Sequence, residues 1–86
     1  MKFDFDPEKS EANRIKHGID FVGAQALWDD PDRLQVPART QGEARFMLIG
    51  RIGEKHWSAI HTIRDETVRI ISVRRSRTLE VERYEE

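Results

Sequence analysis

The 86-residue sequence contains no cysteine, which excludes a disulfide framework and a thiolate metal site. No apolar run approaches the roughly 20 residues needed to cross a bilayer, and the opening stretch MKFDFDPEK lacks the apolar core of a signal peptide. The histidines show no metal-binding spacing, and no glycine-rich phosphate loop joins a strand to a helix. We therefore expect a cytoplasmic protein with no membrane contact, no metal and no cofactor.

Charged residues are abundant, at 36% of the chain, although the net charge is only −1. Residues 1–43 contain six Lys or Arg and nine Asp or Glu, whereas residues 44–86 contain nine and seven. Four arginines and no acidic residue lie between Thr67 and Thr78. This local excess of positive charge indicates either an anion-binding site or arginines that only keep a sheet edge soluble.

Two helices are expected in the N-terminal part of the chain. Asp6-Pro7-Glu8 is typical of a helix start, because Asp can cap and Pro suits the first helical position. Gly18 is suited to end this helix. A second helix is expected from Asp20 to the residues before Pro31. Its apolar face would contain Phe21, Ala24, Leu27 and Trp28.

Beyond Pro31, the pattern of apolar residues becomes that of strands. Strands are predicted over 34–37, 44–52, 56–64 and 67–74, and a short strand or an extended lead-in is predicted around Phe3. Ser76 is expected to cap a short final helix. The order predicts an α+β fold with two N-terminal helices, a three- to four-stranded antiparallel sheet and a short C-terminal helix. Residues 1–86 would form one domain.

The turn at Asp65-Glu66 sets an expected register for the last two strands. A two-residue turn places His61 opposite Ile70 and Trp57 opposite Arg74, so that His61 and Arg74 share one face of the sheet. One register slip or one bulge would exchange the faces. The opposite face would carry Arg64, Arg69 and Arg75.

The residues in these strands suggest a site for phosphodiester chemistry. His61, between apolar neighbours, is either a core histidine or a general acid or base. Guanidinium groups match phosphate oxygens and stabilise the charge that builds during phosphodiester cleavage. A ribonuclease that uses the 2′-hydroxyl of its substrate needs no metal. Its base could be His61 or Glu43, and its cations Arg64, Arg74 and Arg75, although any one of these arginines could instead form a surface ion pair.

Aromatic residues could contribute to RNA binding by stacking on bases. We expect substrate contacts from Trp57, Arg77 and Tyr84. Alternatively, Trp57 packs in the core, and Tyr84 belongs to a C-terminal tail that has no role. His17 is expected to lie in a helix end, and His56 to be exposed near a turn.

Two motifs resemble a known family. DPEKSEANRIKHG resembles the DPxKxxxNxxKHG motif of BrnT-type toxins, RIISVRR resembles their RIISxRR motif, and the resemblance covers nearly the whole chain. It implies a RelE-like endoribonuclease toxin that inhibits translation. Its partner would be a BrnA-type antitoxin with a ribbon-helix-helix element, and DNA would be contacted only through the antitoxin. The site residues it implies are His61, Arg64, Arg74, Arg75, Glu43 and Tyr84.

The sequence departs from the family pattern at Phe5, where Trp is common, and at Val73, where Ala is common. The C-terminal TLEVERYEE is also more acidic than expected for the family. An alternative function is therefore a non-catalytic module whose arginine cluster docks an acidic antitoxin segment. A DNA-binding repressor is disfavoured, because no expected helix is basic. The DPxKxxxNxxKHG motif is expected to be structural.

Overall fold

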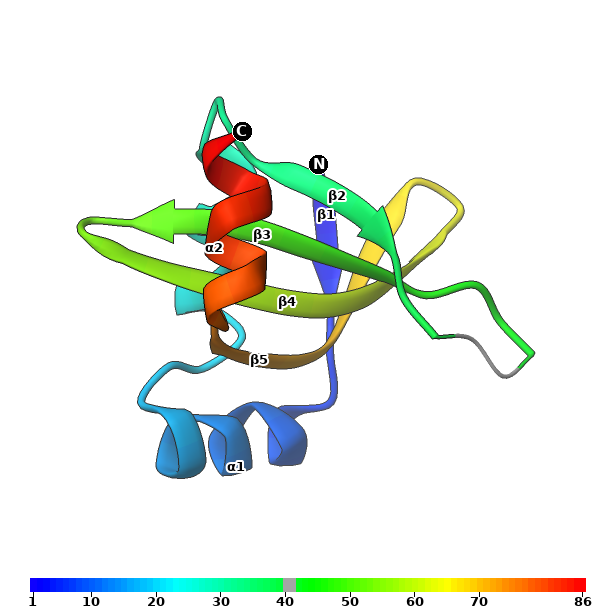
Figure 1. Ribbon diagram of the computed structural model, residues 1–86. Coiled ribbons are helices and arrows are strands. Elements are labelled where there is room, and N and C mark those ends of the chain that lie inside the picture. The colour runs from blue at the N-terminus through cyan, green and yellow to red at the C-terminus, as the bar shows by residue number, and fades with distance from the viewer. Residues whose placement is uncertain (40–41) are drawn as a thin grey trace.

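The computed structural model describes residues 1–39 and 42–86, which form a five-stranded mixed sheet and three helices (Figure 1). The order along the chain is β1 (Lys2–Asp4), α1 (Pro7–His17), the 3₁₀ helix η1 (Gly23–Asp29), β2 (Leu34–Pro37), β3 (Phe46–Ile52), β4 (Lys55–Arg64), β5 (Thr67–Arg75) and α2 (Thr78–Glu85). The order across the sheet is β1-β5-β4-β3-β2. No described helix is long and apolar enough to cross a membrane.

The expected three- to four-stranded antiparallel sheet was wrong, because β1 extends the sheet to five strands and pairs with β5 in parallel. A short strand or an extended lead-in was expected around Phe3, but no local pattern in so short a segment indicates its partner strand or the parallel direction. Its place depends on distant contacts, such as the ring of Phe3 against Trp28 at 5.3 Å. The second expected helix is also a 3₁₀ helix and not an α-helix, with Gln25 N donating to Val22 O.

Helix α1 forms as predicted. The Asp6 carboxylate accepts a hydrogen bond from Glu8 N at 2.9 Å, and Pro7 occupies the first turn. At the other end Gly18 has a φ of 82°, and its N–H donates to Arg14 O at 2.9 Å. Both caps belong to the DPxKxxxNxxKHG motif, whose predicted structural role is confirmed here.

Asn13 attaches α1 to the sheet. Its side-chain nitrogen donates to Ile19 O at 2.8 Å and to Val73 O at 2.9 Å. In return, Val73 N donates to Asn13 Oδ1 at 3.1 Å. Because β1 pairs with β5 only at Thr67–Arg69, Asn13 satisfies the backbone of β5 beyond the end of β1.

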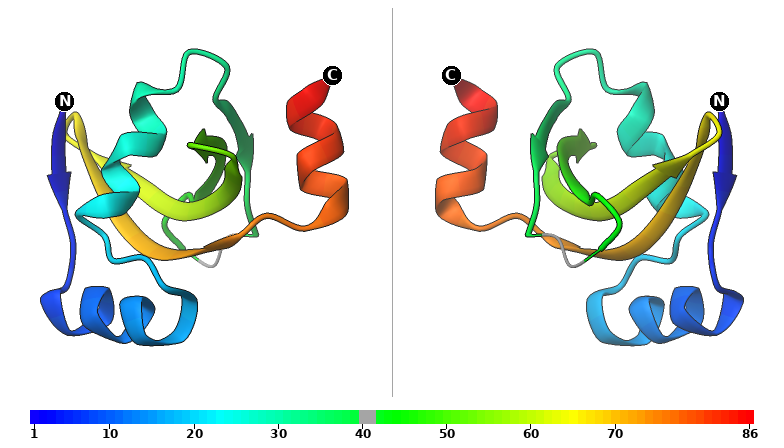
Figure 2. Two further views of the ribbon diagram at one scale, coloured as in Figure 1. Left: turned by 90° about the vertical axis from the view of Figure 1, so that its left-hand side faces the viewer. Right: turned by 90° about the vertical axis from the view of Figure 1, so that its right-hand side faces the viewer.

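The two faces of the sheet are covered in different ways. Helix η1 lies over one face and α2 over the other (Figure 2). The core lies on the η1 side, where Leu27 is 0% exposed. Helix α2, by contrast, has no buried residue. The core side chains are those of Phe21, Ala24, Leu27, Trp28, Leu48, Trp57, Ala59, Val68, Ile70 and Val73.

A bulge changes the expected register of β4 and β5. His61 lies opposite Ile70 as predicted, but Trp57 lies opposite Arg75, and not opposite Arg74. The register shifts between Ile60 and His61, where Ile71 of β5 has no partner. The prediction that His61 and Arg74 share a face was therefore wrong. Arg74 lies with Ser58 on the α2 face, and Arg75 with Trp57 on the η1 face.

Candidate functional site

The expected site residues lie at two ends of β4. Arg64 is at the C-terminal end of this strand, whereas Arg74 lies opposite Ser58, near its beginning. Six residues of extended strand separate these positions, which corresponds to about 20 Å. A single phosphate cannot contact both arginines at this separation.

At the far end, Arg64 forms an ion pair with Glu43. Its Nε lies 2.5 Å from Glu43 Oε2, and its terminal nitrogen lies 2.8 Å from Oε1. The hydrogen bond from Arg64 lowers the pKa of the Glu43 carboxyl. Both side chains are exposed, so the pair is of the kind that contributes little to stability.

His61 is fully buried on the η1 face, at 0% exposed. Its ring lies between those of Trp28 and Phe46, with centroids at 5.0 Å and 5.9 Å. Nδ1 lies 3.2 Å from Ala59 O, and Nε2 lies 3.1 Å from Gln35 Oε1. Burial lowers the pKa of the ring. Contact with substrate would therefore require the core to open around it.

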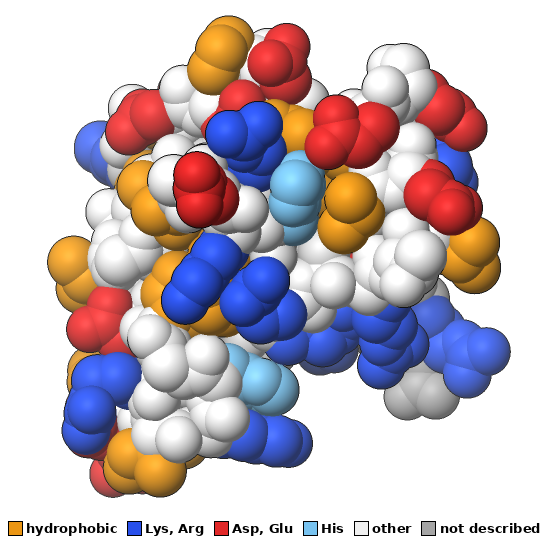
Figure 3. All heavy atoms as spheres, turned by 60° about the vertical axis from the view of Figure 1, so that its left-hand side comes forward, with side chains coloured by type: hydrophobic (Ala, Val, Ile, Leu, Met, Phe, Trp, Pro, Cys, Tyr) orange, Lys and Arg blue, Asp and Glu red, His pale blue; other side chains and the backbone are white. Residues whose placement is uncertain are grey.

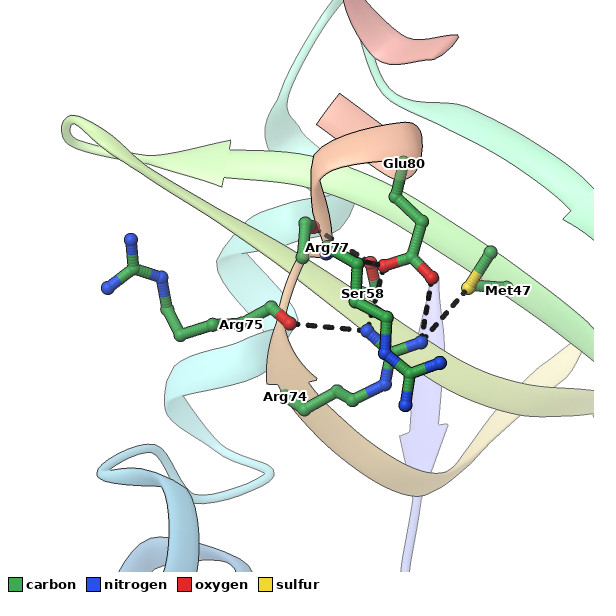
Figure 4. A network of polar contacts seen from close by, with 7 residues as sticks. Met47, Ser58, Arg74, Arg75, Arg77 and Glu80 are labelled. Atoms are coloured by element: carbon green, nitrogen blue, oxygen red, sulfur yellow. Dashed lines mark hydrogen bonds and ion pairs between the residues drawn. The ribbon is translucent and has the colours of Figure 1, made fainter. Parts of the chain in front are cut away.

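Near the start of β4, Arg74 is held by Glu80 of α2 (Figure 4). Its two terminal nitrogens donate to the two carboxylate oxygens, each at 2.7 Å. Ser58 Oγ and Arg77 N donate to Glu80 Oε1 at 2.8 Å and 2.9 Å. Ser76, the expected cap of α2, instead shares a hydrogen bond with Ser58, and the helix begins after Arg77.

The Arg74 guanidinium is thus fixed but not saturated. One terminal nitrogen contacts Met47 Sδ at 4.0 Å, and sulfur is a weak acceptor. No described residue accepts a hydrogen bond from Arg74 Nε. The side chain of Arg74 is 27% exposed, and its Nε is the guanidinium nitrogen that an added anion could still accept a hydrogen bond from.

Arg75 and Arg77 flank this group in the sequence. Arg75 lies over the Trp57 ring with its Cζ 5.5 Å from the centroid, and it points away from the Glu80 network (Figure 4). Within residues 1–39 and 42–86, neither Arg75 nor Arg77 pairs with a carboxylate. Lys and Arg side chains gather across the middle and lower part of the face in Figure 3.

Tyr84 and His56 occupy the opposite end of α2. The Tyr84 hydroxyl donates to Asp30 Oδ2 at 2.7 Å, and burial together with this contact raises its pKa to about 12. The ring of Tyr84 meets that of His56 edge-on at 5.1 Å. His56 Nε2 is buried and lies 3.3 Å from Glu85 Oε1, without the alignment of a hydrogen bond.

Sequence reasoning missed both Glu80 and His56. Glu80 had a local signal, because an acidic residue at the third helical position bonds back to the backbone at the helix start. His56 was expected to be exposed, but it is half-buried and shares the α2 face with Ser58. The sequence shows that His56 and Ser58 are two residues apart and so share a face of the strand. That Arg74 lies on the same face follows only from the bulge.

The network around Glu80 makes stability depend on pH. The hydrogen bonds, that from Arg74 foremost, lower the pKa of Glu80 from 4.5 to about 2. A carboxyl with a depressed folded-state pKa stabilises the fold above its unfolded pKa, and loses that effect as pH falls toward the folded value. We expect Glu80→Gln to cost about 2–3 kcal/mol above pH 4.5 and much less near pH 2. Urea unfolding of both proteins between pH 2 and 6 measures this, and parallel curves would contradict it.

Comparison with known proteins gives one match. The family model of BrnT, described as a ribonuclease toxin of type II toxin–antitoxin systems, matches residues 5–80. The match begins just after β1, covers α1, η1 and the strands β2 to β5, and ends in the first turn of α2 at Glu80. No curated protein matches the chain.

Proposed function

Because the chain belongs to the BrnT family of ribonuclease toxins, we propose that it is an endoribonuclease in which the 2′-hydroxyl of the RNA attacks the adjacent phosphate without a metal. The reaction builds negative charge on the phosphate oxygens. Rigid donors aimed at that charge lower the barrier without the cost of reorganising in the transition state.

The observation that carries this proposal is the state of Arg74. Glu80 fixes its guanidinium through two hydrogen bonds, and its Nε donates to no described residue. Arg75 and Arg77, which are unpaired among the described residues, supply further positive charge from the same end of β5. Arg74 is then the oriented donor, and its two neighbours attract and hold the RNA backbone.

The other predicted site residues take different roles in this proposal. Trp57 is 8% exposed and supports Arg75 from beneath, so the exposed guanidinium of Arg75, and not the indole, is the group that can contact RNA. Tyr84 holds the end of α2 through Asp30. The buried His61 supports the core, and the Arg64–Glu43 pair lies too far away for the same phosphate.

A type II toxin has an antitoxin as its partner. The proposed partner is a BrnA-type ribbon-helix-helix protein in the cytoplasm, through which the toxin is linked to DNA. The Arg74–Glu80 contact also favours the alternative function, a module that docks an acidic antitoxin segment, because it demonstrates how a carboxylate fits this arginine. Tight antitoxin binding without any cleavage of RNA would favour that alternative.

Cleavage of a single-stranded RNA in EDTA tests the proposed function. The wild type should cleave, and Arg75→Ala/Arg77→Ala should require about tenfold more RNA for the same rate, because two phosphate contacts are lost. The slope of log affinity against log salt concentration should also become shallower by about 1.4, because each phosphate contact to a single strand contributes about 0.7. Arg14→Ala is the control, since Arg14 pairs with Glu11 on the exposed side of α1. A wild type that is inactive in EDTA, or a double variant with unchanged affinity, would contradict the proposal.

A further inference from the structure

The half-buried side chain of His56 places its Nε2 out of contact with solvent and without a hydrogen bond among the described residues. The nearest acid, Glu85, lies 3.3 Å away out of alignment, and its side chain is 58% exposed in the last turn of α2. Unpaired buried nitrogens are uncommon, and functional sites are among the places where they occur.

The position of His56 relates it to Arg74. His56 and Ser58 lie two residues apart on one face of β4, about 7 Å along the strand, and Ser58 lies opposite Arg74. Ser76 N donates to His56 O at 3.0 Å, which continues the pairing of the two strands beyond Arg75. A base for the 2′-hydroxyl must lie within a side-chain length of the cation that binds the phosphate. Among the described histidines, only His56 is on the face of Arg74.

We propose that His56 is the proton-transfer residue of the ribonuclease centre, a role that rests on the proposed function. The 2′ O–H bond breaks and its proton passes to the neutral imidazole, while the 2′ oxygen forms a bond to phosphorus. The bond from phosphorus to the 5′ oxygen breaks, and the 5′ oxygen takes a proton from water. The resulting hydroxide is neutralised by the proton on His56. The products are a 2′,3′-cyclic phosphate and a 5′-hydroxyl.

The surroundings of His56 also explain how the centre is covered. Glu85 and Tyr84 face it from α2, and Arg51 lies opposite it on β3. Glu80 and Glu85, both on α2, therefore contact the two proposed functional groups of the sheet, Arg74 and His56. Because the side chain of Glu85 is 58% exposed, it can rotate away from Nε2 while Tyr84 keeps the end of α2 in place through Asp30.

The experiment compares RNA cleavage by the wild type, His56→Gln and His56→Ala from pH 5 to 9. We expect the rate of His56→Gln to be about 10²-fold below that of the wild type at each pH at which the wild type cleaves. Added imidazole should restore part of the activity of His56→Ala, which a purely structural role would not allow. His17→Gln, at the end of α1, is the matched control and should keep both rate and profile.

The outcomes separate this inference from the proposed function. If the wild type cleaves, Arg75→Ala/Arg77→Ala is impaired and His56→Gln keeps the wild-type rate and pH profile, the role of His56 is refuted and the ribonuclease remains. If the wild type leaves RNA intact, both fail. Far-UV circular dichroism and thermal unfolding show whether each variant is folded, and the imidazole rescue applies only to folded His56→Ala.

Discussion

Arg74→Ala is expected to lower the rate of RNA cleavage by about 10²–10³-fold, the usual effect of removing one preorganised donor from a developing oxyanion. Arg74→Lys should recover little of this loss. An ammonium group lacks the planar fork of a guanidinium, so it cannot form two hydrogen bonds to Glu80 and also offer further N–H groups to the phosphate. Single-turnover cleavage of a short RNA measures the chemical step, and wild-type rates in Arg74→Ala would refute the role given to this residue.

A folding defect could imitate that loss, because Arg74→Ala leaves the Glu80 carboxylate partly buried with only its Ser58 and Arg77 contacts. Arg74→Ala/Glu80→Ala removes both partners and should be more stable than Arg74→Ala alone. Its cleavage rate should stay low. Recovery of cleavage together with stability would mean that Arg74 serves only the fold.

Asn13→Ala is expected to destabilise the protein by about 3–5 kcal/mol. Asn13 is 7% exposed, and its removal leaves the backbone of Val73 and the carbonyl of Ile19 without partners. Each buried group without a hydrogen bond costs about 1–3 kcal/mol, and a domain of this size has only about 5–10 kcal/mol in total. Urea unfolding measures the loss.

Asn13→Asp is the sharper test, because it keeps the shape of the side chain. The oxygen that replaces the amide nitrogen would face the carbonyl oxygens of Ile19 and Val73, so the loss should be at least as large as for alanine. Lys16→Ala, on the exposed side of α1, should change the free energy of unfolding by less than about 0.5 kcal/mol. A similar small loss for Asn13→Asp would show that α1 does not depend on this anchor.

The elements of this fold that have strong local signals were predictable. The start and end of α1 follow from Asp6-Pro7 and Gly18, whose chemistry acts within one helical turn. The turn at Asp65-Glu66 also fixed the neighbouring pair of His61 and Ile70. In each case the residues that determine the structure are close together in sequence.

The parts that failed depend on distant contacts. The parallel pairing of β1 joins Phe3 to Val68, and no local pattern encodes such a partner. The bulge at Ile71 is hidden because Ile70 and Ile71 are both apolar, so either residue satisfies the alternation on its face. The contact between Arg74 and Glu80 could be predicted only once the register of β4 and β5 was known. The sequence alone therefore did not show which charged residues meet at the candidate site.

Ile71 also determines how chains related to this one should be compared. If Ile71 instead paired with Ile60 in a continuous ladder, every side chain of β5 beyond it would turn to the reverse side of the sheet. Arg74 would then stack on the indole and Arg75 would meet the carboxylate of α2, with the same amino acids still present. An alignment that matches the two arginines by sequence alone, without regard to whether β5 contains the bulge, would exchange the roles of the two guanidinium groups.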